Sequence, residues 1–564
     1  MRSSIQIVIA LLAVVVQTTA RAADDPPPTF PITIEIDAAK SLGPLRRVWR
    51  FFGADEPNYA TMKDGEKLLS SLGELDPGAV YFRTHNLLTS GDGTPALKWG
   101  STNVYTEDAQ GNPIYTWTIV DRIFDTYLAR GVRPYVEIGF MPQALSVQPD
   151  PYRPIWRPGF KYGAIKGGWA FPPKDYAKWG ELVFQWTKHC VERYGREEVE
   201  KWYFETWNEA NYPAYWYGTP EEFNKLHDYA IAAVRRALPT ARVGGPDTAG
   251  SGGKFMDDFL AHVTRGKNHA TGQSGTPTDF IAFHAKGSPT YVDGHVRMGI
   301  AAHLKTIDEG FAKIAANAAV KSKPIIIGES DPEGCAACQG PQLAYRNGTM
   351  YSSYTAASFA RKHDLADIHG VNFEGALTWA FEFEDQPYFA GFRALASNGL
   401  DLPVLNVFRI FSQMRGERVA VRSTGAIALP DMLEKGVREQ PDVSAFASYD
   451  GSKLYVMVWH YHDDDVPGPA AKVELNAKHL QRGRRNATLT HYRIDQDHSN
   501  SYAAWQRLGS PITLDEEQYV QVETAGKLAQ VGKPQQITIK DGSGTVTFTL
   551  PRQGVSLLVF DPRS

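Results

Sequence analysis

The sequence predicts an α/β fold in which a (β/α)8 barrel is followed by an accessory all-β sandwich. Between about 48 and 378, eight short β-rich runs alternate with helical patterns. Several of these runs are almost wholly apolar, as parallel strands covered on both faces are. After about 419, strand-like runs separated by Gly, Asp and Pro follow one another with no long helix between them, a pattern typical of a sandwich.

The helical patterns of the first region lie between its expected strands. Asp175 is expected to cap a helix that runs to Tyr194, and Thr219 precedes Pro220 at a second helix start. A doubly wound open sheet is the alternative, but no G-x-G-x-x-G motif follows the first strand. The expected barrel strands are 48–53, 80–84, 133–138, 201–205, 242–245, 279–283, 324–328 and 370–378.

The later strands predict a second domain. The segment 32–36 alternates apolar and polar residues and is expected to add a strand to it, which would make that domain discontinuous. The expected sandwich strands are 444–448, 453–459, 472–475, 487–494, 536–539, 545–550 and 555–560. The predicted organisation is a signal peptide at 1–22, an N-terminal segment at 23–44 that joins the sandwich, a catalytic barrel at 45–415 and the sandwich at 416–564.

Composition narrows the class of protein. Apolar residues make up 43% of the 564 residues and charged residues 22%, values of a globular chain that exclude general disorder. Lys and Arg number 59 and Asp and Glu 63, so the net charge of -4 gives no basic excess for nucleic acid. The 13 Trp and 26 Tyr suit either the stacking surfaces of a sugar-binding cleft or a large core.

The N-terminus has the pattern of a targeting segment. Arg2 precedes an unbroken apolar run at 7–16, and Ala20-Arg21-Ala22 fits a cleavage site. The run is too short to cross a bilayer, which needs about 20 residues. We therefore expect a secreted or periplasmic protein without a membrane anchor; a buried N-terminal helix is the alternative.

The three cysteines do not form a disulfide scaffold. Cys190 stands alone, whereas Cys335 and Cys338 have the C-x-x-C spacing. A local disulfide, half of a zinc site and two free thiols all remain open for this pair. Zinc usually takes four protein ligands at a structural site, so no metal is expected.

Two acids follow strands at the end of the barrel where catalysis takes place. Glu209 follows the fourth expected strand and Glu329 the seventh, and the carboxyl ends of parallel strands meet at one face. Cleavage of an acetal needs one protonated and one ionised carboxyl group on either side of the bond. The alternative for each acid is a helix cap or an ion pair.

Several motifs together resemble one family of glycosidases. Trp207-Asn208-Glu209 is similar to the W-N-E segment of a large clan of retaining barrel glycosidases. With 82–85 (F-R-T-H), 137–142 (E-I-G-F-M-P) and 491–495 (H-Y-R-I-D), the chain resembles glycoside hydrolase family 39, the β-xylosidase and α-L-iduronidase family, from about Val48 to the C-terminus.

The resemblance implies roles for the site residues. Glu209 would be the general acid/base, and Glu329 the nucleophile that forms a covalent glycosyl-enzyme. Asn208 would bind the sugar 2-OH, and Trp379 would form the floor of the sugar subsite. The other residues implied at the subsite are His85 and His284 on its walls, with Glu384 and Asp385 as acceptors of sugar hydroxyls.

One motif resembles the iduronidase branch of the family. His284-Ala285-Lys286-Gly287 has the H-x-K-G form, in which the lysine would meet a substrate carboxylate, and Arg393 would supply a second cation. The alternative is that Lys286 pairs with Asp331 or Glu333.

The expected function is that of a retaining exo-acting β-xylosidase, which releases xylose from the non-reducing ends of xylo-oligosaccharides and needs no cofactor. An α-L-iduronidase-like or α-L-arabinosidase-like glycosidase is the first alternative, and a non-catalytic carbohydrate-binding protein is the second. The sequence leaves self-association into a homo-oligomer open.

Overall fold

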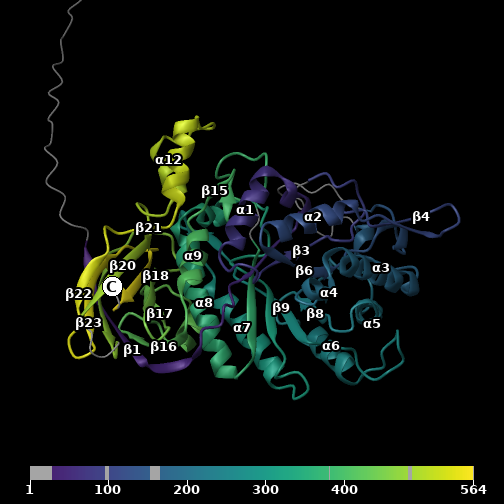
Figure 1. Ribbon diagram of the computed structural model, residues 1–564, viewed down its shortest axis with the longest axis horizontal. Helices are drawn as coiled ribbons and strands as arrows, with labels where there is room; N and C mark the ends of the chain where they lie inside the picture. Colours follow the sequence, from purple (N-terminus) through teal and green to yellow (C-terminus); the bar gives the residue numbers. More distant parts are fainter. Residues whose placement is uncertain (1–27, 96–100, 153–165, 380–381, 481–484, 563–564) are drawn as a thin grey trace, which may run out of the picture.

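The computed structural model describes residues 28–95, 101–152, 166–379, 382–480 and 485–562. A closed eight-stranded barrel and a ten-stranded sheet lie side by side, with helices between them (Figure 1). Within the described residues, every helix is too short or too polar to cross a bilayer. The predicted signal peptide at 1–22 lies outside the described residues and stays a prediction.

The barrel strands pair in parallel in chain order, and β13 pairs with β2 to close the ring. All eight predicted strands are confirmed, because buried apolar runs of this length suit parallel strands covered by helices. The strands are β2 (Phe51–Ala54), β3 (Val80–Thr84), β6 (Val132–Ile138), β7 (Tyr203–Thr206), β8 (Arg242–Thr248), β9 (Phe280–Lys286), β12 (Ile325–Asp331) and β13 (Phe373–Trp379).

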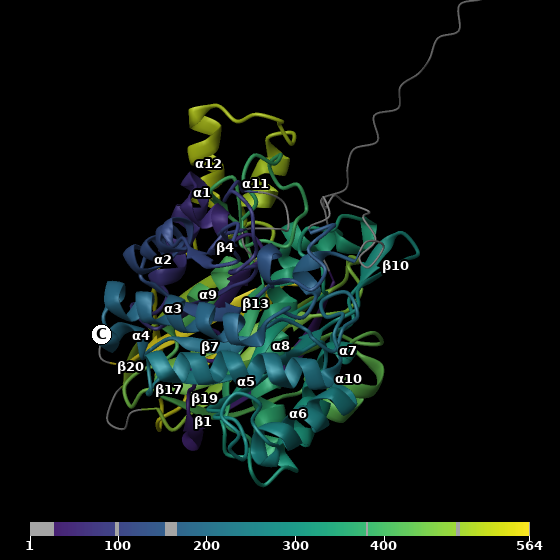
Figure 2. The same cartoon turned by 90° about the vertical axis from the view of Figure 1, so that its right-hand side faces the viewer.

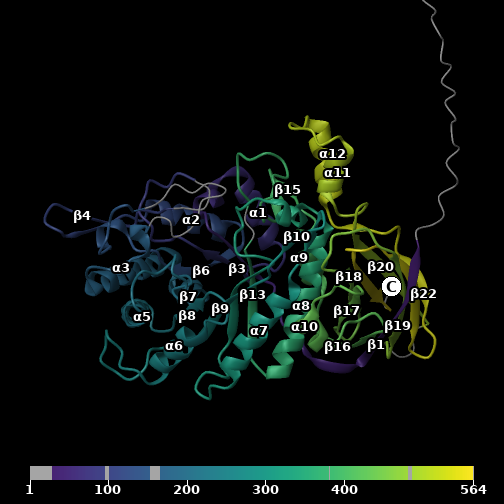
Figure 3. The ribbon, with the colours of Figure 1, turned by 180° about the vertical axis from the view of Figure 1, so that it is seen from behind.

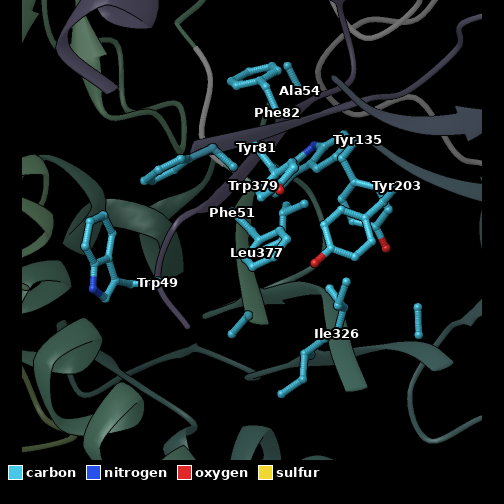
Figure 4. Packing of buried hydrophobic residues seen from close by; sticks show 14 of the residues in the cluster. Trp49, Phe51, Ala54, Tyr81, Phe82, Tyr135, Tyr203, Ile326, Leu377 and Trp379 are labelled. Carbon is cyan, nitrogen blue, oxygen red and sulfur yellow. The ribbon is translucent and has the colours of Figure 1, made fainter. Parts of the chain in front are cut away.

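Aromatic rings fill the barrel interior. Figure 4 shows Phe51, Tyr81, Tyr135 and Tyr203 gathered inside the ring of strands. The ring centroids of Phe51 and Tyr81 are 5.2 Å apart, and those of Tyr81 and Tyr203 are 4.9 Å apart. This packed layer makes the barrel solid, so a ligand site has room at the carboxyl ends of the strands.

Helices follow the strands around the barrel. The side chain of Asp175 accepts hydrogen bonds from two backbone N–H groups of α3, and Thr219 forms a capping box with Glu222 at the start of α5, so both predicted helix starts are confirmed. The helices are α1 (Lys63–Gly73), α2 (Thr118–Ala129), α3 (Tyr176–Tyr194), α4 (Arg196–Val199), α5 (Pro220–Ala237), α6 (Gly253–Arg265), α7 (Ile300–Ala315), α8 (Thr349–His369) and α9 (Leu405–Gln413).

The sheet packs against the barrel through α8 and α9, as Figures 1 and 3 show from opposite sides. Helix α8 is buried around most of its circumference, and it is rich in small side chains such as Ser352, Ser353 and Ala357. Ser353 donates a hydrogen bond to Gln553, which precedes the last strand of the sheet, at 2.6 Å. Small residues on α8 therefore let the barrel and the sheet approach from two sides.

The sheet curls on itself around a core of its own. Buried side chains from both of its halves, among them Ile34, Val456, Val473, Leu489 and Leu558, form one cluster. This is the predicted all-β domain. Its strands run in the order β21 (Ala529–Gln530), β20 (Asn486–Ile494), β24 (Val555–Asp561), β18 (Leu454–Tyr461), β17 (Asp442–Tyr449), β16 (Glu417–Ser423), β1 (Thr29–Pro44), β19 (Ala470–Lys478) and β23 (Gly544–Leu550), with β22 (Gln535–Thr538) paired to β20.

The N-terminal strand lies inside this sheet. β1 contains the expected strand at 32–36, and it pairs in parallel with β19 and antiparallel with β16. The two ends of the described chain therefore belong to one sheet. The domain limits at 22, 44 and 415 stay predictions.

Three short helices interrupt the strands of the sandwich region, and the strand pattern did not predict them. Helices α10 (Leu429–Lys435), α11 (Ser501–Arg507) and α12 (Glu516–Gly526) lie there, and Figure 2 shows α11 and α12 next to α1. Asp515 and Gln518 form a capping box at the start of α12, a signal that the sequence contains and the strand pattern obscured. Lys67 on α1 and Glu523 on α12 form an ion pair at 2.6 Å.

Candidate active site

Glu209 and Glu329 lie together at the carboxyl end of the barrel. Glu329 is on β12, and Glu209 follows β7. One carboxylate oxygen of each and one ring nitrogen of His284 all lie within 4.8 Å of one another. The two carboxylate side chains are 16% and 10% exposed. The structure thus brings the two acids into one site, where both side chains are largely buried.

Strand register brings the cations to these acids. On the adjacent strands β9 and β12, His284 is paired with Glu329 and Lys286 with Asp331. Residues two apart on a strand point to the same face, so the four side chains share the barrel interior. Lys286 Nζ is 2.5 Å from Oε2 of Glu329 and 2.9 Å from Oδ2 of Asp331.

His284 bridges two carboxylates. Its Nδ1 lies 2.7 Å from Oε1 of Glu209, and its Nε2 lies 2.9 Å from Oδ2 of Asp247 on β8. Burial acts to lower the pKa of His284, but Asp247 and Glu329 outweigh it and raise the pKa to about 10. Both ring nitrogens therefore carry protons at neutral pH and donate to the two acids.

Glu329 is held as a carboxylate. Burial raises its pKa, but the positive charges of His284, Lys286 and Arg83 lower the pKa well below its usual range. Arg83 Nη1 lies 3.3 Å from Oε1 of Glu329. The site therefore keeps Glu329 ionised.

Arg83 on β3 is the centre of a buried network below the two glutamates. The guanidinium is wholly buried, and Nη2 contacts Oε2 of Glu137 at 3.0 Å and Oδ1 of Asn208 at 3.1 Å. It also pairs with Glu205 and Asp247. Arg83, Glu137, Glu205 and Asp247 are not among the site residues that the sequence predicts, although charged residues inside apolar strands are a signal for such a network.

His85, Asn208 and Trp379 lie around the acid pair. His85 Nδ1 is 2.6 Å from Oε2 of Glu137, and its ring meets the Trp379 ring edge-on with the centroids 5.3 Å apart. The Trp379 ring lies over Gly53, where a Cβ atom would fall 2.5 Å from it. Gly53 is therefore what leaves room for the tryptophan.

Tyr215 is a site residue that sequence reasoning missed. Its ring stacks on Phe140 with the centroids 5.8 Å apart. Burial, and then the charges of Asp55, Glu209 and Glu329, raise the pKa of Tyr215 well above its usual value. The hydroxyl thus stays protonated beside the acids as a donor.

Both cations expected to meet a substrate carboxylate have acidic partners. Lys286 pairs with Asp331, as the alternative expected. Arg393 is wholly buried, with Nη1 2.8 Å from Oδ1 of Asp331 and Nε 2.7 Å from Oε1 of Glu333. A substrate carboxylate would have to compete with these acids for either cation.

Glu384 and Asp385 lie on the loop after β13. Glu384 Oε1 accepts hydrogen bonds from the backbone N–H groups of Asp64 at 2.7 Å and Gly65 at 2.9 Å, in the first turn of α1. Asp385 is exposed. Glu384 therefore caps a helix, and the sugar-binding roles of the two acids stay predictions.

The pairing left open for Cys335 and Cys338 is a disulfide, with the Cα atoms 5.4 Å apart. Arg346 donates to the carbonyl oxygens of Cys335 at 2.7 Å and Cys338 at 2.6 Å. Glu333 accepts from the backbone N–H of Cys335 at 2.7 Å. The disulfide thus closes a tight loop after the strand that carries Glu329.

A barrel that brings two glutamates together from its fourth and seventh strands offers the pair of carboxyl groups that glycosidases use to cleave an acetal. The sequence profile of Glycosyl hydrolases family 39 matches residues 32–541, most of the chain. The chain belongs to this family, and the resemblance found in the sequence is confirmed.

The relatives of this chain include proteins named β-xylosidase and proteins named α-L-iduronidase. The chain is 26% identical over 505 residues to a β-xylosidase of Caldicellulosiruptor saccharolyticus, covering 88% of this chain and 91% of the relative. It is 24% identical over 547 residues to the human α-L-iduronidase, covering 88% and 74%. A solved structure of a monomeric β-xylosidase from Caulobacter crescentus has a TM-score of 0.72 at 22% identity and covers 94% of this chain and 100% of its own, which establishes a shared fold.

His284→Gln should change how stability depends on pH. An unfolded histidine has a pKa of about 6.5, whereas His284 in the folded protein has a pKa of about 10. A raised pKa contributes stability that is fully present below the unfolded value and is lost as pH rises through the folded value. The difference in Tm between the protein and the variant should therefore shrink as pH rises from about 6 to about 10.

His479→Gln, which removes an exposed imidazole from the sandwich, is the matched control for this titration. A Tm difference for His284→Gln that stays constant or grows over the same range would show that His284 is not held as a cation.

Glu384→Ala should lower the free energy of unfolding by about 1 kcal/mol, because the backbone N–H groups at the start of α1 lose their acceptor. Urea unfolding measures this, and Asp385→Ala is the exposed control, expected to change stability by less than about 0.5 kcal/mol. If Glu384→Ala instead raised KM without loss of stability, its carboxylate would belong to substrate binding.

Proposed function

We propose that this chain is a retaining, exo-acting β-xylosidase that releases xylose from the non-reducing ends of xylo-oligosaccharides. The main support for this mechanism is a distance: one carboxylate oxygen of Glu209 lies within 4.8 Å of one carboxylate oxygen of Glu329. Retaining glycosidases have their two carboxyl groups about 5 Å apart, whereas inverting enzymes need about 6.5–9.5 Å to fit a water molecule. The relatives named β-xylosidase support the choice of sugar.

In the first step Glu329 attacks the anomeric carbon, and the bond from that carbon to the leaving oxygen breaks. Glu209 donates a proton to the leaving oxygen. Oε1 of Glu209 accepts a hydrogen bond from His284, so the transferable proton belongs on Oε2. The products are a covalent glycosyl-enzyme on Glu329 and the shortened oligosaccharide.

In the second step Glu209, now a carboxylate, takes a proton from water. The oxygen of that water attacks the anomeric carbon and releases Glu329 as a carboxylate. His284 and Lys286 stabilise the carboxylate that departs, because both already lie beside it. Two inversions leave the configuration of the sugar unchanged.

The surrounding residues hold the sugar. Trp379 offers a ring face as a floor, and Asn208 is fixed by the hydrogen bond that its Oδ1 accepts from Arg83, which leaves its amide nitrogen as the donor to a sugar hydroxyl. The small exposure of the two glutamates suits a subsite for one terminal sugar. The N-terminal segment 1–22 supports export to the periplasm or the medium, where oligosaccharides are met.

Glu329→Ala should abolish turnover of a nitrophenyl β-xyloside, because no nucleophile remains. Glu209→Ala should lower kcat on unactivated xylobiose by about 10²–10⁴-fold, the contribution of a general acid, and recover in part on nitrophenyl xyloside, whose leaving group needs little protonation. Proton NMR of the first product formed should show the β-anomer of xylose.

Glu192→Ala, which removes an exposed carboxylate of α3, serves as the control for the loss of an acid outside the site. Full activity in either glutamate variant, or an α-anomer as the first product, would contradict the mechanism.

The second candidate is an α-L-iduronidase-like activity, which Lys286 favours as a cation inside the sugar site. Because Lys286 also contacts Glu329, Lys286→Met should affect xyloside cleavage as well. Loss of this cation raises the pKa of Glu329, so the acidic limb of the pH profile of kcat/KM should move to higher pH. An unchanged acidic limb would show that Lys286 does not keep Glu329 ionised.

Substrate choice is measured on the unmodified protein. Aryl β-xyloside, α-arabinofuranoside and α-iduronide compared at one pH should give the largest kcat/KM for the xyloside. A larger value for the iduronide would favour the second candidate, and binding without cleavage of any of them would favour a carbohydrate-binding protein.

A further inference from the structure

A second group of metal-ligand side chains lies outside the active site. In the part of the chain that the structure describes, two clusters of His, Asp and Glu have ligand atoms within 4.8 Å of one another, and one of them is the active-site group. The other consists of Asp228 on α5, His262 on α6 and His269 in the loop after α6. That loop leads into β9 at the amino end of the barrel strands, opposite the catalytic glutamates.

Asp228 holds the cluster together. It is wholly buried, and its Oδ2 lies 2.9 Å from His262 Nε2 and accepts a hydrogen bond from the backbone N–H of His269 at 2.7 Å. Thr276 donates to the other oxygen. A buried carboxylate fixed from three sides is a rigid ligand.

The loop positions His269 over His262. Asn268 is buried, and its Oδ1 accepts from the backbone N–H groups of Ala270 and Thr271, each at 2.9 Å. The two imidazole rings lie nearly parallel, with centroids 5.6 Å apart and an interplanar angle of 19°. The fold therefore brings both imidazoles to the carboxylate, with the ligand atoms within 4.8 Å of one another.

The carboxylate of Glu221 lies near enough to serve as a fourth ligand. Glu221, in the first turn of α5, has Oε1 3.0 Å from Nε2 of His269 and is exposed. Two imidazoles with one or two carboxylates form the donor set that zinc and similar ions prefer, whereas calcium and magnesium prefer oxygen alone.

We propose that Asp228, His262 and His269 form a binding site for zinc or a similar divalent transition-metal ion, with Glu221 or water as the fourth ligand. The ion joins α5, α6 and the loop between α6 and β9. Because it binds the folded chain, it stabilises this side of the barrel. The site is distinct from the catalytic pair and does not depend on the proposed activity.

The test is calorimetric titration of tag-free, chelator-treated protein with zinc chloride, together with the Tm at each zinc concentration. We expect a saturable site and a rise in Tm. His269→Ala, at an exposed position, should weaken zinc binding by about 10-fold or more and remove the rise in Tm. Asp228→Asn should do the same where it folds.

Two variants separate this site from other imidazoles and from the catalytic cluster. His479→Ala removes an exposed histidine of the sandwich, and Glu329→Gln removes a ligand from the active-site group; both should keep the site and the rise in Tm. Absence of saturable binding overturns the proposal, and so does binding that survives in His269→Ala or is lost in Glu329→Gln alone.

Discussion

A buried cation, Arg83, is the constraint on which the catalytic end of the barrel depends. An unpaired guanidinium in a protein interior would be strongly destabilising, and carboxylates from the third, fourth and fifth strands surround this one, with Glu329 from the seventh strand next to it. Each carboxylate must lie level with the guanidinium along the barrel axis, so these ion pairs favour one register between the strands. The geometry of Glu329 follows from that register, because His284 and Lys286 stand beside it on the neighbouring strand.

The same network explains how one site separates the states of its acids. Burial raises the pKa of Glu205 well above its usual value despite Arg83, whereas the cations lower the pKa of Glu329 and that of Asp247. Glu329 therefore owes its negative charge to the fixed cations that surround it, which is electrostatic preorganisation.

Sequence patterns predicted the parts of the structure that local physics determines. Apolar runs identified all eight barrel strands, and position at a strand end identified Glu209 and Glu329. Arg83 and Asp247 were missed because their partners come from other strands, and only the closed barrel brings them together. Helix α12 was missed although its capping box at Asp515 is local, since the strand periodicity around it dominated the prediction. Glu384 has a cap role that no local signal shows, as its helix lies far away in the sequence.

The sandwich reaches the active-site side of the barrel through helices rather than strands. Phe389, on the loop that continues from β13, packs against Tyr502 and Trp505 of α11 with ring centroids 5.4 Å and 5.0 Å apart. The same loop carries Glu384, which caps α1, and α1 in turn pairs with α12 through Lys67. The loop that extends the Trp379 strand is thus held between the barrel and two helices inserted in the sandwich. Because loops at this end of a barrel shape its ligand site, the insertion of α11 and α12 ties the second domain to the end of the barrel that carries Glu209 and Glu329.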